Sequence, residues 1–318
     1  MQDKKIKIVF MGTGNFAVPI IEKLNNNYDV RLLVCSPDKP VGRRHVMTPP
    51  PTKRFALQNG IQIEQPVRLK DNKAFLQKLK QVNADIIVVV SYGKILPADI
   101  INLPEHGCLN IHGSILPKYR GPSPIQTAIK SGDQETGISV ILMDTGMDTG
   151  DIVVEEVIEI KNEDNYESLS ERMSKFSADL INDILPEYIK GNVNLEVQDD
   201  DEASYCTKIL SEMGKVQWSQ SATSIRNTVR AYASLIGVYS TYKDKRLYFE
   251  ETEISIDSEN IDLPLGTVYR SKDNPKDILI KCGKDSLKLI KVKLEGKKVV
   301  TVKDFLNGHQ DLIGTTLK

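Results

Sequence analysis

Cysteine is scarce in this sequence. The four cysteines, Cys35, Cys108, Cys206 and Cys282, lie far apart and form no CxxC pair or Cys/His cluster, which argues against a structural zinc site and a disulfide scaffold. No apolar run reaches the roughly 18 residues that a membrane helix needs. The basic start "MQDKKIKIVF" lacks a long apolar stretch and is not a signal peptide. We therefore expect a cytoplasmic protein without a membrane segment.

The chain also lacks an excess of positive or of negative charge. The chain has 42 Lys and Arg against 43 Asp and Glu, so the total charge does not indicate a polyanionic partner. The balance is uneven, because residues 205–318 hold 19 Lys and Arg against 14 Asp and Glu. This modestly basic part could bind nucleic acid, and it could equally be a solvated surface.

The N-terminal part alternates between strand and helix patterns. Strands are expected within residues 5–14, 28–36, 61–66, 84–93 and 108–113, and helices within 15–27, 49–60, 71–83 and 122–132. A strand–loop–strand unit (136–160) and a long helix (165–191) follow. Such alternation is typical of an α/β fold with a parallel sheet.

The pattern changes after residue 190. Residues 191–207 are polar, acidic and aperiodic, as in a linker. Beyond them come one helix (221–234), short strands separated by turns (237–294) and a short closing helix (301–310). Short strands with regular turns predict a small all-β barrel. We therefore expect domains at 1–190 and 208–318, joined by a linker at 191–207.

The stretch "GTGNFA", from Gly12 to Ala17, follows the first expected strand and opens a helix. It fits the loose G-x-G-x-x-A pattern of dinucleotide-binding turns, and Asp38 follows the second strand. A nicotinamide oxidoreductase is therefore one hypothesis. Glycines at such a turn can also serve only to bring helix and strand close together.

The segment "LNIHGSILPKYRG", from Leu109 to Gly121, contains two polar residues in a short apolar strand. Because side chains alternate along a strand, Asn110 and His112 point the same way. Burying polar groups without partners costs about 1–3 kcal/mol each. The pair therefore has structural partners, or this face opens into a site at the carboxyl end of the strand, where open α/β sheets bind ligands.

The loop "MDTGMDTGD", from Met143 to Asp151, contains three aspartates. It lacks the ligand spacing of a calcium loop, and it could be merely a solvated turn. If one of its aspartates lies near His112, the set gains an acid that favours the protonated imidazole and supports proton transfer.

These motifs together resemble a known family. "SYGKILP", "NIHGSILPKYRGPSPIQ" and "TGISVILMDTGMDTGDI" are similar to segments of the formyltransferases that use 10-formyltetrahydrofolate. Nearly the whole chain resembles those members that act on initiator tRNA. The resemblance implies an N-terminal Rossmann-like domain and a C-terminal OB-like β-barrel. It also implies transfer of the formyl group of 10-formyltetrahydrofolate to the α-amine of methionyl initiator tRNA for translation initiation, by a monomer without a metal.

The resemblance also implies roles for individual residues. Asn110 and His112 would be catalytic donors to the oxyanion of the reaction. Asp148 aligns with the family's catalytic aspartate, and Asp144 and Asp151 are its less favoured neighbours. The folate site would be lined by Ser114, Ile115, Leu116 and Pro117.

The basic loop 37–54 gains a role from the same resemblance. Arg43, Arg44 and Lys39, with Lys53 nearby, would contact the acceptor end of tRNA, and Lys297 and Lys298 would hold the tRNA body. Three alternatives remain besides the oxidoreductase: formyl transfer to a glycinamide ribotide, formyl transfer to an amino sugar, and a non-catalytic RNA-binding module.

One stretch departs from the family. Where members usually have an "RAFNPWPGA"-like segment, residues 230–238 read "RAYASLIGV". The Asn-Pro-Trp-Pro element is missing, which affects packing after the linker rather than the catalytic set.

Overall fold

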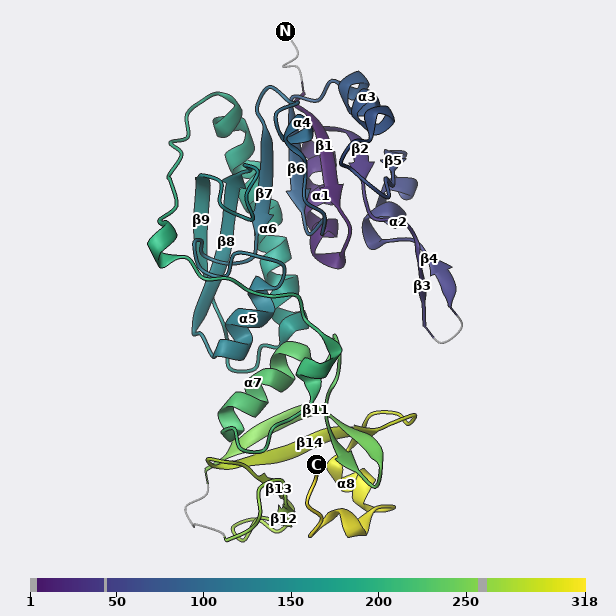
Figure 1. Ribbon diagram of the computed structural model, residues 1–318, viewed down its shortest axis with the longest axis vertical. Coiled ribbons are helices and arrows are strands. Elements are labelled where there is room, and N and C mark those ends of the chain that lie inside the picture. Colours follow the sequence, from purple (N-terminus) through teal and green to yellow (C-terminus); the bar gives the residue numbers. More distant parts are fainter. Residues whose placement is uncertain (1–4, 43–44, 257–261) are drawn as a thin grey trace. The chain divides into compact units, whose positions relative to one another are not determined.

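The computed structural model describes residues 5–42, 45–256 and 262–318, and the chain divides into two compact units (Figure 1). The first unit comprises Met1–Pro124, Glu135–Glu159 and Ser168–Thr207, and the second comprises Ile125–Gln134, Ile160–Glu167 and Lys208–Lys318. The expected domain limits at 190 and 208 stay a prediction. Among the described helices, none is long and apolar enough to cross a membrane.

The first unit is built on a seven-stranded sheet in the order β5-β2-β1-β6-β7-β8-β9. These strands are β1 (Lys7–Gly12), β2 (Asp29–Val34), β5 (Gln62–Glu64), β6 (Ile86–Val90), β7 (Cys108–His112), β8 (Glu135–Leu142) and β9 (Ile152–Glu159). The five strands from β5 to β7 run parallel. β8 and β9 pair antiparallel, because a short loop joins them and leaves no room for a crossover. The expected α/β class with a parallel-type sheet is confirmed.

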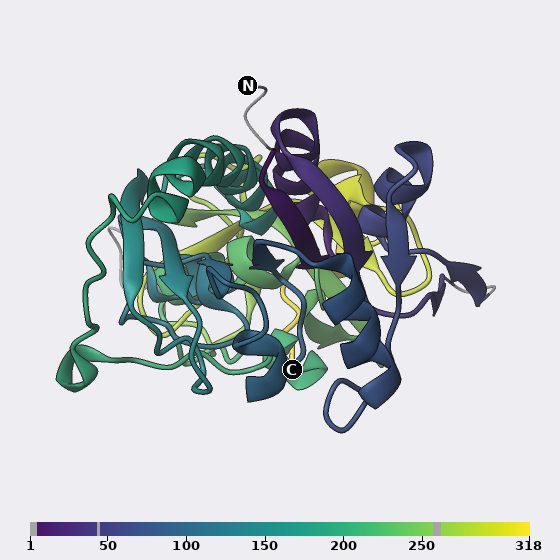
Figure 2. The ribbon, with the colours of Figure 1, turned by 90° about the horizontal axis from the view of Figure 1, so that it is seen from above.

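Helices cover both faces of this sheet. They are α1 (Val18–Asn27), preceded by the 3-10 turn η1 (Asn15–Ala17), then α2 (Pro51–Gln58), α3 (Lys73–Val82), α4 (Ala98–Ile101) and α6 (Tyr166–Ile189). Figure 2 shows α1 and α6 on one side of the strands. Side-chain bonds join these two helices, such as Lys23 to Asp179 at 2.8 Å. Helices α1 and α2 each have a proline in the first turn, where its missing N–H is not needed. Helix α3 begins after Asn72, whose side chain accepts a hydrogen bond from the Phe75 N–H.

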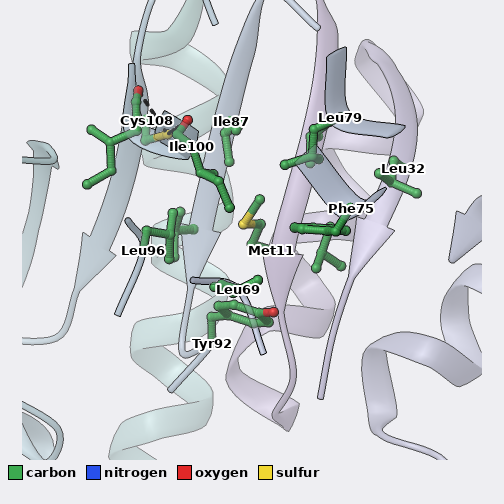
Figure 3. Packing of buried hydrophobic residues seen from close by; sticks show 14 residues of the cluster. Met11, Leu32, Leu69, Phe75, Leu79, Ile87, Tyr92, Leu96, Ile100 and Cys108 are labelled. Atoms are coloured by element: carbon green, nitrogen blue, oxygen red, sulfur yellow. Dashed lines mark hydrogen bonds between the residues drawn. The ribbon is translucent and has the colours of Figure 1, made fainter. Parts of the chain in front are cut away.

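The opposite face of the sheet carries the cluster drawn in Figure 3. Met11, Leu32 and Ile87 point from alternate positions of β1, β2 and β6 toward Phe75 and Leu79 of α3. The apolar residues on one face of α3 thus pack against the apolar residues on one face of the sheet, which alternate along each strand. The cluster also takes in Val89 near the carboxyl end of β6 and Cys108 at the start of β7, the strand that carries the polar pair.

A short hairpin occupies the region expected as a basic loop. β3 (Lys39–Val41) pairs antiparallel with β4 (Val46–Thr48). From the sequence we expect a loop here and no strands, because three backbone pairs are too few to leave a hydrophobic pattern in a proline-rich stretch. Arg43 and Arg44 lie outside the described residues.

The second unit contains α7 (Ala222–Tyr232) and an antiparallel sheet in the order β10-β11-β14-β13-β12. The strands are β10 (Val238–Tyr242), β11 (Lys245–Ser255), β12 (Val268–Arg270), β13 (Ile278–Lys281), β14 (Ser286–Leu294) and the short β15 (Val300–Thr301), which pairs with β14 and precedes α8 (Val302–Leu306). This unit also takes in most of α5 (Pro124–Ser131). The expected C-terminal sheet of OB-like type is confirmed.

The atypical stretch 230–238 closes α7. The Tyr232 carbonyl accepts hydrogen bonds from the backbone N–H groups of residues 235, 236 and 237. Gly237, at φ 75°, then turns the chain into β10. Arg230 donates to the carbonyls of Lys161 and Asp164 at 2.8 and 2.6 Å. The stretch therefore forms an ordinary helix end without the proline-rich element.

Candidate active site

Asn110 and His112 stand together near the carboxyl end of β7. Leu109 and Ile111, which alternate with them, are buried in the apolar core. Asn110 is half-buried, and His112 is only 5% exposed. The predicted alternation therefore holds, and the polar pair needs partners on its own face.

The partner is Asp148, in the loop between β8 and β9. Asn110 Nδ2 donates to Asp148 Oδ1 at 3.1 Å. His112 Nδ1 lies 3.6 Å from Asp148 Oδ2, an ion-pair distance longer than a hydrogen bond. The backbone N–H of Gly121 donates to Oδ2 at 2.9 Å. The carboxylate of Asp148 thus brings Asn110 and His112, the other two predicted catalytic residues, to one place.

The imidazole of His112 is held from both sides. Its Nε2 lies 3.0 Å from the carbonyl oxygen of Tyr119, while Nδ1 faces Asp148. A carbonyl oxygen can only accept, so Nε2 carries a proton in this arrangement. The other nitrogen faces a carboxylate, so the ring lies between an acceptor on each side, a geometry that suits a group taking part in proton transfer.

The other loop aspartates do not share this arrangement. Asp144 Oδ1 accepts from the N–H of Gly146 and from Thr149 Oγ1 at 2.9 and 2.8 Å, which closes the loop on itself. Asp151 begins the return to β9, and its carbonyl accepts from the N–H of Leu142. Across residues 5–42, 45–256 and 262–318, no three His, Cys, Asp or Glu side chains form a group that could hold a metal.

The segment Ser114–Pro117 follows β7 after Gly113 and packs on β8 and β9. The Leu116 N–H points at Ser139 Oγ (3.0 Å) and Glu155 Oε1 (2.9 Å). Ser139 Oγ also contacts the Ser114 carbonyl at 2.7 Å and the Glu155 carboxyl closely. Burial raises the pKa of Glu155, although its hydrogen bonds with Ser139 and Leu116 oppose the shift. Side chains under the segment thus fix its backbone.

The residues predicted to contact tRNA are only partly described. Lys39 is exposed on β3, whereas Arg43 and Arg44 lie outside the described residues. Lys53 is engaged elsewhere, since its Nζ lies 2.8 Å from both Asp38 Oδ1 and Gln65 Oε1. Lys39 therefore remains the accessible cation among the described candidates of this loop.

The glycine turn after β1 has a packing role. A Cβ on Gly12 would lie 2.6 Å from Phe10 Cε1 and 2.9 Å from the Val90 carbonyl oxygen, whereas one on Gly14 would meet nothing within 4 Å. Asp38, the acid that the dinucleotide hypothesis needs for a ribose, is paired with Lys53. Close packing of Gly12 against β1, β6 and Ala17 of η1 explains this turn without a dinucleotide.

Sequence reasoning missed three groups that hold the site: the Tyr119 carbonyl, the Gly121 N–H and Gln198. The first two lie inside the quoted motif, where backbone groups leave no residue signature. Gln198 lies in the segment read as a linker, yet its Nε2 donates to the Asp148 and Gly150 carbonyls at 2.9 and 2.7 Å. No local pattern in the sequence could have indicated that contact.

Known proteins share both parts of the chain. Residues 4–185 match the family model described as formyl transferase, and residues 208–310 match that of the formyl transferase C-terminal domain. The methionyl-tRNA formyltransferase of Caldanaerobacter subterraneus subsp. tengcongensis is 40% identical over 314 residues, covering 98% of this chain and 100% of that protein.

Solved structures agree on the fold. An N-formyltransferase from Helicobacter canadensis, in complex with folinic acid and dTDP-3-aminofucose, has a TM-score of 0.66 at 17% identity and covers 89% of this chain and 98% of its own. A methionyl-tRNA formyltransferase from Clostridium thermocellum has a TM-score of 0.52 at 19% identity and covers 79% and 94%. At these identities the likeness concerns the fold alone.

Proposed function

The chain belongs to the formyl transferase family, and we propose that it transfers the formyl group of 10-formyltetrahydrofolate to the α-amino group of methionyl initiator tRNA, for translation initiation. The observation that carries the proposal is the convergence of Asn110 and His112 on the carboxylate of Asp148. Membership of the family identifies formyl transfer as the reaction that these three residues would catalyse. The full-length similarity to a named methionyl-tRNA formyltransferase supports the choice of tRNA.

Each catalytic residue has a role that suits its surroundings. The Asn110 amide has two N–H groups, and only one is needed for Asp148. The second can donate to the oxygen on which negative charge develops, a contact worth about 10²–10³ in rate. His112 supplies a further proton donor, and Asp148 keeps the imidazole oriented and assists removal of the proton from the attacking amine.

The segment beside this set would bind the co-substrate. When bound, 10-formyltetrahydrofolate supplies an activated formyl group. Ser114, Ile115, Leu116 and Pro117 would line its site, with Leu116 buried and the backbone held by Ser139 and Glu155. Because its backbone is already held by these hydrogen bonds, the segment could orient the ring system of the folate without changing its own conformation. We further propose a cytoplasmic monomer that needs no metal.

The tRNA would meet cationic groups of both units. Lys39 is exposed on the hairpin, and Arg43 and Arg44 follow it in sequence. Cations position the phosphate backbone and do not read bases. The exposed Lys297 and Lys298 of the second unit would add to this contact.

The test is formylation of charged initiator tRNA by the purified chain with 10-formyltetrahydrofolate. We expect His112→Ala and Asp148→Ala each to lower kcat strongly. Undiminished rates in both variants would refute the site. Offering an amino sugar nucleotide, glycinamide ribotide and NADH separately tests the rivals. Formylation of a small amine as efficient as that of tRNA would refute the tRNA substrate.

A further inference from the structure

The loop that presents Asp148 adopts a backbone that it does not favour by itself. Asp148 has φ 57°, in the left-handed region that costs energy for a residue with a Cβ. Gly150 passes so close to β8 that a Cβ there would lie 1.9 Å from the Leu142 carbonyl oxygen. A catalytic carboxylate on such a loop needs outside groups to hold it.

Gln198 supplies that hold. Its Nε2 donates to the carbonyl of Asp148 at 2.9 Å and to that of Gly150 at 2.7 Å. Gln198 is only 7% exposed, so these bonds are shielded from water. One amide group thus spans the two residues on either side of Thr149 and fixes the carbonyls of the turn.

Arg120 determines which way the Gln198 amide faces. Arg120 Nε donates to Gln198 Oε1 at 2.9 Å. Because a guanidinium has only donors, it must meet the oxygen of the amide, and the NH₂ group must then face the loop. Arg120 therefore orients the two donors that reach Asp148 and Gly150.

Arg120 is itself buried, and burying its charge costs desolvation free energy. It is 1% exposed, its Nη1 lies 2.8 Å from Asp200 Oδ1, and its Nη2 has no hydrogen-bond partner within the described part of the chain. The desolvation cost of a buried guanidinium is offset only when all its N–H groups have partners. With Nη2 unpaired within that part of the chain, Arg120 is a poor choice for a purely structural contact. Its neighbour Gly121 donates to the Asp148 carboxylate. Gly121 thus holds the Asp148 side chain directly, whereas Arg120 acts on the Asp148 backbone through Gln198.

We propose that Arg120 and Gln198 are positioning residues for formyl transfer. They act through the backbone of Asp148 and set where its carboxylate meets Asn110 and His112. This inference rests on the proposed function, because it assumes that Asp148 takes part in the reaction. It assigns a role in the chemistry to a segment that follows α6 and looks like a linker in the sequence.

The test is Gln198→Glu in the full-length chain. The variant keeps an oxygen for Arg120 and nearly the same volume, but it removes both donors to the loop. We expect kcat to fall about 10- to 100-fold, as for a small misplacement of a catalytic group, while the KM for each substrate stays close to that of the wild type. Gln62→Glu, the same change at an exposed position on β5, is the matched control and should retain full activity.

A double-mutant cycle separates positioning from general damage. If Gln198 acts through Asp148, adding Gln198→Glu to Asp148→Asn should lower the residual kcat by less than about twofold. A further fall as large as in the single variant would overturn the proposal. If Gln198→Glu does not fold, the cycle is run with Arg120→Lys, which keeps the charge and loses the fork. An unimpaired Asp148→Asn would refute the proposed site itself, whereas an impaired Asp148→Asn beside a fully active Gln198→Glu would refute only this inference.

Discussion

At the scale of single residues, the half-buried carboxyl of Glu155 connects stability to pH. It lies under the segment Ser114–Pro117, contacts Ser139, which is fully buried, and accepts from the Leu116 N–H. Burial is the largest cause of its raised pKa. The folded protein therefore holds the Glu155 proton more tightly than the unfolded chain does.

The sign of the resulting effect follows from linkage. Below the unfolded pKa of a glutamate, about 4.3, the stabilisation from this proton is fully present. It is lost as pH rises through the higher folded pKa. We expect Glu155→Gln to reduce the fall in stability over that interval. Urea unfolding midpoints measured from about pH 4 to 8 would show a flatter profile for the variant.

The neighbouring Glu156, which is exposed, gives the control. Glu156→Gln should keep the wild-type pH profile. If Glu155→Gln and the wild type lose stability in parallel as pH rises, the raised pKa of Glu155 has no part in folding.

At the scale of elements, the two glycines in the turn from β1 into η1 and α1 test whether that turn serves packing or ligand binding. A methyl group on Gly12 meets the Phe10 ring and the Val90 carbonyl, whereas the same group on Gly14 meets nothing. We expect Gly12→Ala to destabilise the fold by about 1–3 kcal/mol and Gly14→Ala to change stability by less than about 0.5 kcal/mol. Denaturant unfolding of both variants measures this. Equal losses at the two positions would contradict the packing role.

The β3–β4 hairpin leads to a prediction about substrate binding. Lys39→Ala and Arg43→Ala should each raise the KM for tRNA and leave the KM for 10-formyltetrahydrofolate unchanged, because a cation that meets only phosphates positions only the RNA. Steady-state kinetics with each substrate varied in turn gives both constants. Lys73→Ala, which removes an exposed cation from α3, should change neither. Similar increases for tRNA and folate would contradict the hairpin assignment.

The elements differ in how well their sequence predicted them. Buried strands such as β6, a continuous apolar run, and long helices such as α6 were correctly located because their patterns extend over many residues. The four-residue α4 and the three-residue strands of the hairpin are too short for a pattern. The Asn110–His112 pair followed from strand alternation alone. Asp148 needed the family resemblance, and Gln198, fifty residues further on, could be found only in three dimensions.

At the scale of the whole molecule, the net charge of −1 conceals a basic C-terminal part. We expect the KM for tRNA to rise with salt between about 50 and 200 mM, with a log–log slope that counts the phosphate contacts. The KM for folate should change much less. Replacing Lys297 and Lys298 together by Gln should reduce the slope by about one to two.

Lys175 on α6 and Lys190 just after it are exposed, and each pairs with a glutamate of α6. Replacing both by Gln provides the matched control. That variant should keep the wild-type slope. If it lowers the slope as much as the Lys297 and Lys298 variant does, total charge rather than the second unit governs the contact with tRNA.

The path of the chain between α6 and the second unit has a practical consequence for protein engineering. Gln198 reaches the loop of Asp148, the Arg120 N–H donates to the Ser204 carbonyl, and the Cys206 N–H donates to the Arg120 carbonyl. A chimera that takes its C-terminal module from a relative should therefore be joined after Cys206. A junction placed at residue 191 would replace the residues that brace this chain's catalytic loop by those of the relative, and a segment that resembles a linker would then give the hybrid a mismatched active site.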